Sequence, residues 1–522
     1  MDHSSYQIQL IGYCELDKDA IQQKFNQNGV SELVNLSGNY TIVIENNQET
    51  YIITSPYCVC QYYYTIKDHQ IFHDQTLLGI LKNSQISWSW NWQSFADLIL
   101  LDHTLELDTL HPDIHRVPSA SILHFKQGKL NISSLSWEEL NPPKPTSAKQ
   151  AVDTYNQAVE AWITDDVVVS MSGGFDSRLI LGSVLKLGYK PPLVTMGYDE
   201  STDVVIAKQI ANHFGLDLSL INLNFDDYFK FGQTISALTN GTKSSRHWHT
   251  YVYSYQAQLN QNQLMYIGTN GGFAKNFYYD KGIQAIYKNI TASIPTLHQL
   301  WKGRLKPFFT SDELQEITPE LAQEFSEEKK QQRIQRLTQL SHNQLLGGLE
   351  RFYLEQRVQN FMANGMRLYS ENLNWCAPFM SREWVRDIWN LDRKWRLGNN
   401  WHRYAIQQTY PQLINFPEQG EFSNKMYSKA PLFYWKDKRK TAPIVSYAKY
   451  PQWFQQDFVR EFIFDNQELL SNWITPEAIR TIVEDHYQTG KRTNTVAFLV
   501  TQIFWQMNLN VISSKSIIAN SR

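Results

Sequence analysis

The chain has 522 residues, 42% hydrophobic and 19% charged, with a formal net charge of −3 at pH 7. That length predicts two or three domains, and the composition excludes a disordered or fibrous chain. Because 48 basic side chains nearly balance 51 acidic ones, no global field would recruit a nucleic acid or an anionic membrane.

The four cysteines, Cys14, Cys58, Cys60 and Cys376, form neither a CxxC pair nor a zinc-type spacing with histidine. This is typical of free thiols in a reducing compartment. The first ten residues, MDHSSYQIQL, lack a secretory signal pattern. The longest apolar stretch is taken to be FADLILLDHTLEL, which is interrupted by acids and far shorter than a membrane span. We therefore expect a cytoplasmic protein without a membrane partner.

Residues 6–138 carry short strand-like segments between Asn, Gly and Asp residues, among them GNYTIVIE, TYIITS, YYYTIK and QIFHD. The stretch SASILHFKQGKLNIS indicates a hairpin that turns at Gly128, and residues 92–101 indicate a helix. The prolines of NPPKPTSAKQ, residues 141–150, interrupt both kinds of element and predict a domain boundary.

Strands and helices alternate after this boundary. The segments are the strand VVVSM, the helix SRLILGSVLKLG ending at Gly188, the strand PPLVTMG, the helix STDVVIAKQIANHFG with Ser201 or Thr202 as N-cap and Gly215 as stop, and the strand LDLSLINL. This order implies right-handed crossovers and a doubly wound parallel sheet. From about 290 to 510 the chain is predicted to be mostly helical.

The stretch SGGFDS, Ser172 to Ser177, joins the first of these strands to its helix. Ligands bind beside the carboxyl ends of parallel strands, where a helix N-terminus offers unpaired amides and a positive dipole end. Gly173 and Gly174 allow the backbone to curl around a phosphate, and the hydroxyls of Ser172 and Ser177 can donate to it. Asp176 can hold Mg²⁺.

The alternative is a plain strand–helix turn, which six suitable residues in one spacing disfavour. The stretch lacks the GK[ST] of a Walker A loop and is not GxGxxG, so a dinucleotide is also disfavoured.

SGGFDS resembles the pyrophosphate loop of ATP pyrophosphatases, which cut ATP between the α- and β-phosphates. Other stretches are similar to asparagine synthetase, in chain order and over nearly the whole length: LVNLSGNYTIVI, HDQTLLGIL, TLHPDIHRVPSASILHF, LVTMGYDESTDVVIAKQIANHFGLDLSLI and NGMRLYSENLNWCAPFMSREWVRDIWNL. The chain is thereby identified as a member of the asparagine synthetase-like group, which includes β-lactam synthetase and lasso-peptide cyclases.

The resemblance implies an α/β protein of two domains. Residues 1–140 would form a degenerate class II glutamine amidotransferase-like domain, an Ntn-hydrolase-like β-rich sandwich. Residues 148–515 would form the ATP-binding synthetase domain, a doubly wound sheet of the adenine nucleotide α-hydrolase type with a helical extension.

Members of this group use ATP and Mg²⁺ to adenylate a carboxylate, release pyrophosphate, and let an amine attack the acyl-adenylate. By resemblance, Met171, Met196 and Gly197 would line the adenine and ribose site. Gly268 would begin a second loop that faces the nucleotide.

Three departures from the family pattern bear on activity. The first is at the N-terminus, where a class II amidotransferase exposes a cysteine after Met1 as its nucleophile. Here Asp2 stands in that position, and the first cysteine, Cys14, is internal. Glutaminase activity is therefore not expected, and the first domain is expected to be a structural or substrate-docking module.

The second departure lies in YIGTNGGFAKNFYYD, where the family carries an Asp–Glu pair that binds magnesium and helps to activate the amine. The matched positions are Gly272 and Phe273. Asp176 would then be the main metal ligand, helped by Asp199, Glu200 or Asp280.

The third departure lies in NFPEQGEFSNK, where the family places a transition-state lysine near Gln419. Arg178, Lys275 and Lys425 are the catalytic cations that could replace it. A guanidinium at Arg178 could bind phosphate oxygens in a forked geometry, and a solvent-facing arginine is the equal alternative.

Two further patterns are interpreted as structural. RHWH, residues 246–249, lacks a third metal ligand, so its histidines are expected to be ordinary polar residues. The charge run EEKKQQRIQR is expected to be a solvated helix face.

The favoured hypothesis is an ATP-dependent ligase that joins a small-molecule or peptide carboxylate to ammonia or a substrate amine without hydrolysing glutamine. The alternatives are a nucleotide-binding pseudoenzyme or accessory protein of a natural-product or polysaccharide biosynthetic cluster, and a tRNA-modifying pyrophosphatase. The near-neutral charge and the lone Cys376 after the loop disfavour the last. The oligomeric state is left open, with a homodimer as one alternative.

Overall fold

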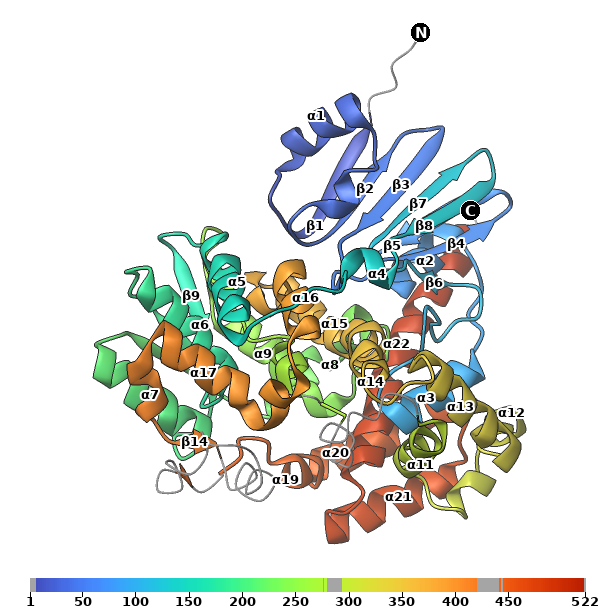
Figure 1. Cartoon of the computed structure of the whole chain (residues 1–522). Helices are drawn as coiled ribbons and strands as arrows, with labels where there is room; N and C mark the ends of the chain where they lie inside the picture. Colours follow the sequence, from blue (N-terminus) through green and yellow to red (C-terminus); the bar gives the residue numbers. More distant parts are fainter. Residues whose placement is uncertain (1–5, 276, 279–292, 420–440, 443–444, 521–522) are drawn as a thin grey trace.

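The computed structural model describes residues 6–275, 277–278, 293–419, 441–442 and 445–520. Figure 1 shows a β-rich N-terminal part lying against a larger part in which helices surround a parallel sheet. The mixed α/β architecture expected from the sequence is confirmed.

The N-terminal part contains two antiparallel sheets. The larger has the order β1-β2-β3-β7-β8 and the smaller the order β5-β4-β6. Their strands are β1 (Gln7–Cys14), β2 (Gly38–Glu45), β3 (Glu49–Thr54), β4 (Tyr63–Lys67), β5 (Gln70–Asp74), β6 (His115–Arg116), β7 (Ser121–Lys126) and β8 (Lys129–Ser134). The helices of this part are α1 (Lys18–Asn28), α2 (Leu77–Ser84), α3 (Trp92–Leu101) and α4 (Trp137–Leu140).

Successive side chains of a strand point to opposite faces of the sheet. In β2 the side chains on both faces are buried. Ile42 and Ile44 share an apolar cluster with Ile21 of α1, whereas Val43 shares one with Tyr64 of the smaller sheet. The predicted hairpin joins β7 to β8 through Gln127 and Gly128, both with positive φ, as a tight antiparallel turn requires.

The larger part is built on a parallel sheet with the order β11-β10-β9-β12-β13. Its strands are β9 (Val167–Ser170), β10 (Leu193–Gly197), β11 (Leu218–Asn222), β12 (Leu264–Tyr266) and β13 (Asn374–Cys376). The order runs outward from β9 in both directions, so the predicted doubly wound sheet is confirmed. Its switch point lies between β9 and β12, where such sheets bind ligands.

Helices form most of the remaining chain, as predicted. They are α5 (Ala148–Glu160), α6 (Phe175–Lys186), α7 (Thr202–Phe214), α8 (Asp226–Leu238), α9 (His249–Gln256), α11 (Ile294–Arg304), α12 (Pro319–Gln323), α13 (Glu327–Leu340), α14 (Gly348–Phe352), the π-helix η5 (Tyr353–Met362), α15 (Ala363–Ser370), α16 (Arg382–Asn390), α17 (Asn400–Thr409), α19 (Tyr450–Phe454), α20 (Asp457–Asp465), α21 (Pro476–Thr489) and α22 (Thr493–Asn520). Two short strands, β14 (Glu418–Gln419) and β15 (Thr441–Ala442), pair in parallel.

One helix overturns an expectation about apolar stretches. Within the described residues, Thr493–Ser513 of α22 is long and apolar enough to cross a membrane, and the interrupted stretch near residue 100 is therefore not the most apolar segment. In the folded protein, 72% of this apolar part of the helix is buried. Trp505 and Phe504 of α22 pack inside the protein, as in the core helix of a large domain.

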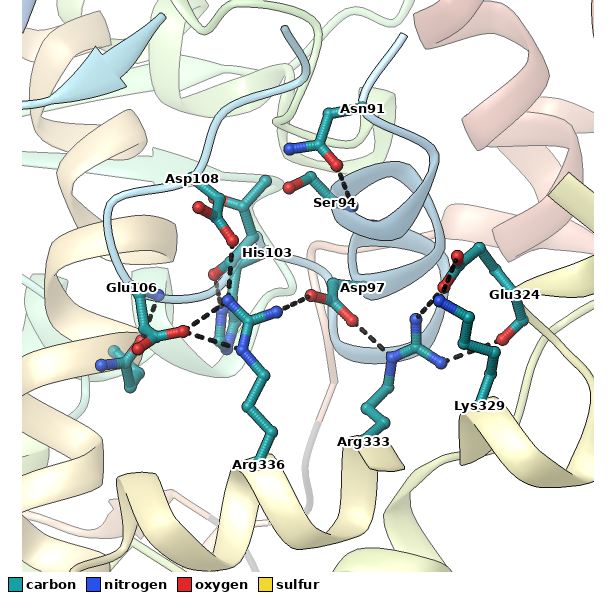
Figure 2. A network of polar contacts seen from close by, with 12 residues as sticks. Asn91, Ser94, Asp97, His103, Glu106, Asp108, Glu324, Lys329, Arg333 and Arg336 are labelled. Carbon is teal, nitrogen blue, oxygen red and sulfur yellow. Dashed lines mark hydrogen bonds and ion pairs between the residues drawn. The ribbon is translucent and has the colours of Figure 1, made fainter. Parts of the chain in front are cut away.

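A network of ion pairs connects α3 to α13 (Figure 2). Asp97, with no exposed side-chain surface, lies 2.5 Å from Arg333 Nε and 3.3 Å from Arg336 Nη1. Arg333 also contacts Glu324, and Arg336 contacts Glu106 and Asp108. The charge run that contains these arginines was predicted to be solvated. That prediction is wrong for Arg333, which is 5% exposed because it pairs with a carboxylate of the N-terminal part.

Candidate nucleotide-binding site

The glycine turn after β9 lies at the switch point of the sheet. β9 ends at Ser170, and α6 begins at Phe175 with Gly174 as its N-cap. Among the described residues no side chain caps this end of α6, so first-turn amides and the positive end of the helix dipole remain available. An anionic ligand fits this position.

The two serines of the turn bond to each other and to its backbone. Ser172 Oγ and Ser177 Oγ are 3.0 Å apart, and the Ser177 hydroxyl also donates to Ser172 O at 3.0 Å. The Gly174 amide donates to Ser172 Oγ at 3.2 Å. The hydroxyls predicted to bind phosphate therefore also shape the turn, and direct donation from them to phosphate stays a prediction.

Asp203, in the first turn of α7, is a residue that the sequence reasoning missed. The Gly173 amide donates to Asp203 Oδ1 at 2.7 Å, so a carboxylate accepts from the loop where a phosphate oxygen was expected. A phosphate that used this amide would have to displace Asp203, and the two negative charges would repel each other.

Arg178 hydrogen-bonds to the backbone of the glycine turn and of residues 416–417. Its guanidinium has no exposed surface and donates to Gly173 O at 2.8 Å, to Phe416 O at 3.1 Å, and to Pro417 O. The alternative of a solvent-facing arginine is therefore wrong. Because three carbonyl oxygens accept from it, Arg178 connects the turn to residues 416–417, and a direct role on phosphate stays a prediction.

Asp176 lies between a lysine and a buried histidine. Lys275 Nζ is 2.9 Å from Asp176 Oδ2, and His402 Nε2 is 2.9 Å from Asp176 Oδ1. Burial would raise the pKa of Asp176, but Lys275 and His402 outweigh it and hold that pKa well below its ordinary value. Burial lowers the pKa of His402, although Asp176 opposes this shift. Lys275 and Asp176 thus form an ion pair beside the loop.

The second loop, which follows β12, packs closely against Asp176. A Cβ at Gly271 would lie 2.4 Å from Asp176 Cγ, and one at Gly268 would lie 3.0 Å from Asp176 Cβ. Glycine is required here because the backbone itself contacts the carboxylate side chain. Gly268 therefore lies beside the first loop, and its position facing a nucleotide stays a prediction.

The comparison with known families agrees with this geometry. A family model described as asparagine synthase matches residues 152–507, which include both loops and every strand of the parallel sheet. The chain belongs to the asparagine synthase family. No curated protein sequence matches the chain.

Asparagine synthase-type proteins are ATP-dependent amide-bond-forming ligases, and the family generally uses ATP. The predicted adenosine contacts lie along β9 and β10. Met171 is 3% exposed and its amide donates to Val194 O at 2.8 Å, whereas Met196 is half-buried. Gly197 has a φ of 141° at the end of β10, a conformation that other residues rarely adopt. Contact between these residues and adenosine stays a prediction.

The described residues fit the phosphates of ATP but not Mg²⁺ at Asp176. The uncapped end of α6 and the close-packed glycines suit a phosphate chain. Asp176 Oδ2, however, already pairs with the Lys275 ammonium, and Asp176 Oδ1 lies 2.9 Å from His402 Nε2. No group of three His, Cys, Asp or Glu side chains is arranged for a metal in the part of the chain that the structure describes.

Gly272 and Phe273 replace the acidic pair of the family with an aromatic contact. Phe273 is 2% exposed and stacks on Tyr353 with centroids 6.4 Å apart, while a Cβ at Gly272 would lie 2.9 Å from the Tyr353 hydroxyl. Arg396 lies 5.5 Å from the Phe273 ring. The second loop is therefore anchored by packing rather than by carboxylates.

Other predicted residues do not join the site or lie outside the described residues. Asp199 pairs with Lys208 at 2.6 Å and Glu200 with Lys449 at 3.3 Å, both at the surface, so neither assists Asp176. Lys425 and Asp280 lie outside the described residues. Among the described residues, Lys275 is the predicted cation that contacts a loop carboxylate.

Sequence reasoning also missed His402 on α17. His402 is fully buried. It follows the glycine loop by more than 200 residues in the sequence. The signal in the sequence is weak, because WHRY resembles any amphipathic helix segment.

Proposed function

We propose that the chain is an AMP-forming ligase that activates a carboxylate as an acyl-adenylate, releases pyrophosphate, and accepts ammonia or a substrate amine directly. The observation that carries this proposal is the meeting of two glycine loops at the switch point of a parallel sheet, inside the region matched by the asparagine synthase family.

ATP would supply the adenylyl group in this reaction. The α6 N-terminus would orient the phosphate chain, and Arg178 would keep the loop rigid through Gly173. Lys275, half-buried and 2.9 Å from Asp176, would place a positive charge beside the phosphates. His402 would hold Asp176 in position.

Ammonia from glutamine is not part of the proposal. Burial raises the pKa of the Cys14 thiol to about 11, so this internal cysteine is a poor nucleophile at neutral pH. The N-terminal part instead packs against the synthetase part through the Asp97 network (Figure 2). It would support the synthetase site rather than supply an amine.

The test is carboxylate-dependent exchange of labelled pyrophosphate into ATP, screened over a panel of carboxylic acids. We expect exchange with the cognate acid, and a decrease of about a hundredfold in Asp176→Ala. Asp153→Ala, at an exposed carboxylate of α5, is the matched control and should exchange normally. Exchange that is unaffected by Asp176→Ala would refute the assignment of this loop.

A nucleotide-binding accessory protein is the second candidate, favoured by one specific observation. The Gly173 amide and both oxygens of Asp176 are already engaged by side chains of the protein. Calorimetry that detects ATP binding, with no AMP formed from any acid in the panel, would support this candidate over the ligase.

A further inference from the structure

Basic side chains surround Phe361 at the C-terminal end of the π-helix η5. Lys243 Nζ lies 3.9 Å from the centre of the Phe361 ring, and Arg357 Cζ lies 4.4 Å from it. The His247 ring is 5.5 Å from Phe361 and 6.0 Å from the His249 ring. We call these five residues the Phe361 cluster.

The basic side chains of this cluster form no ion pair within the described residues, and Asp102 only partly offsets the positive charges that act on Lys243. No carboxylate there forms an ion pair with Lys243, His247, His249 or Arg357, and the nearby Asp102 pairs with Arg246 instead, at 3.4 Å. Lys243 is only 6% exposed, and its one hydrogen bond within the described residues is donated to Phe361 O at 3.3 Å. A buried ammonium with one neutral acceptor is unfavourable unless a ligand completes its shell.

The electrostatics of the cluster agree with this geometry. Burial and the neighbouring Arg357 lower the pKa of Lys243 to about 7. Burial and Lys243 lower the pKa of His249 to about 4, and burial and Lys243 also depress the pKa of His247. Each group therefore experiences a surplus of positive charge, which an anion would relieve.

The cluster lies one helix away from the second nucleotide loop. On α15, a Cβ at Gly365 would lie 3.8 Å from Lys243 Nζ, and Met366 Sδ accepts from the Thr269 hydroxyl at 3.2 Å. Thr269 directly follows Gly268 in the second loop. On η5, the Tyr353 hydroxyl experiences the charges of both Arg357 and Asp176.

The π-helix is an independent sign of function. Such helices are rare and are frequently found at functional sites. Here η5 spans ten residues, Tyr353–Met362, and presents Arg357 and Phe361 from successive turns. Arg357 and His247 are half-buried and form the accessible side of the cluster, whereas Lys243 and His249 are buried.

We propose that the Phe361 cluster binds a phosphate-like dianionic group carried by the second substrate of the proposed ligase, either the acid or the amine. Lys243 and Arg357 supply two positive charges, and His247 and His249 supply further donors. A compact group of several basic donors matches a phosphate better than a single carboxylate. This inference rests on the proposed function for the identity of the substrate, but not for the anion site itself.

The experiment is isothermal titration calorimetry of the full-length chain with inorganic phosphate, with succinate as the dicarboxylate comparison and chloride as the background. We expect phosphate to bind more tightly than succinate. Lys243→Met should weaken phosphate binding by at least about tenfold. Lys243→Arg should retain most of it, and Lys149→Met, at an exposed lysine of α5, is the matched control.

Thermal unfolding separates a binding role from a structural one. Lys243→Met should raise the unfolding midpoint in phosphate-free buffer, because it removes an uncompensated buried charge, and should abolish the upward shift caused by phosphate. A lower midpoint together with unchanged phosphate binding would overturn the proposal, as would a wild-type chain that shows neither heat nor a midpoint shift with phosphate. Tighter binding of succinate than of phosphate would refute the ligand class.

ATP titrations distinguish the two sources of a phosphate group. We expect Lys243→Met to bind ATP as the wild type does, because the cluster serves a different molecule. An equal loss of ATP and phosphate affinity would instead assign the cluster to the nucleotide tail and overturn the inference. If the wild type binds phosphate but not ATP, the anion site stands and the proposed ligase activity fails.

Discussion

Two groups of buried and half-buried basic side chains in this protein differ in their partners. In the network between α3 and α13, Arg333 and Arg336 each contact carboxylates, and the fully buried Asp97 bridges them (Figure 2). Around Phe361, Lys243 and Arg357 contact an aromatic ring and a carbonyl, but no carboxylate among the described residues.

The difference distinguishes structural charge from functional charge. A buried ion pair is costly to break, because the remaining partner is left desolvated and uncompensated. A buried cation without a partner destabilises the ligand-free protein and persists where it contributes to function. The paired network therefore connects the two parts of the fold, and the unpaired cluster is available to a ligand.

The largest expected effect is in the paired network. Arg333→Ala leaves Asp97 buried beside Arg336 alone, and we expect the free energy of unfolding to fall by about 3–5 kcal/mol. Urea denaturation followed by circular dichroism measures this change. A decrease in the free energy of unfolding of no more than about 1 kcal/mol, as for an exposed ion pair, would show that the network does not stabilise the contact between the two parts.

The next effect concerns the pH dependence caused by Lys243. Its pKa is 10.5 in the unfolded chain and about 7 in the fold. Below pH 7 both states are protonated and the full cost of burial applies; between pH 7 and 10.5 only the unfolded chain keeps the proton. The free energy of unfolding, measured for the wild type relative to Lys243→Met, should therefore rise across that window. An identical pH profile for the two proteins would contradict the assigned shift.

A smaller effect is expected at the glycine loop. Asp203→Asn keeps an acceptor for the Gly173 amide but removes the negative charge, so we expect ATP to bind about tenfold more tightly. Calorimetric titration with ATP measures this change, and Asp217→Asn, at an exposed aspartate that precedes β11 at the opposite edge of the sheet, is the control. Weaker binding would mean that Asp203 contributes to the nucleotide site instead of competing with phosphate.

The smallest effect is at the edge of the paired network. The Lys329 side chain is 31% exposed and contacts Glu324 at 3.1 Å. Lys329→Ala should change the free energy of unfolding by no more than about 1 kcal/mol. A loss as large as that of Arg333→Ala would remove the distinction between exposed and buried pairs on α13.

Much of the fold follows from local patterns. The helix 92–101 has the predicted bounds because Asn91 caps it by accepting from the Ser94 amide, and α7 ends at Gly215 because that residue adopts a left-handed conformation. The glycine turn was also predictable, because the residue types that a tight turn requires occur together within the six residues Ser172 to Ser177. These features depend on neighbours in the chain.

The partners of the site residues could not be predicted in the same way. Asp203 and His402 reach the loop from helices about 30 and 225 residues after it, and an ordinary helix sequence does not show which side chain faces a distant turn. Arg178 is an example: from the sequence, solvent and phosphate were equal alternatives, yet its guanidinium donates to three backbone carbonyls.

The sequence by itself determined the order of strands and helices along the chain, the glycine turn, and the residues Gly272, Phe273 and Gln419 where the family pattern has an acidic pair and a lysine, because each depends on residue type and spacing along the chain. Only the tertiary structure decided which charges are compensated. Asp176 contacts Lys275 and His402, whereas Lys243 meets Phe361, because the packing of segments remote in sequence sets the distance between charges and their exposure to water.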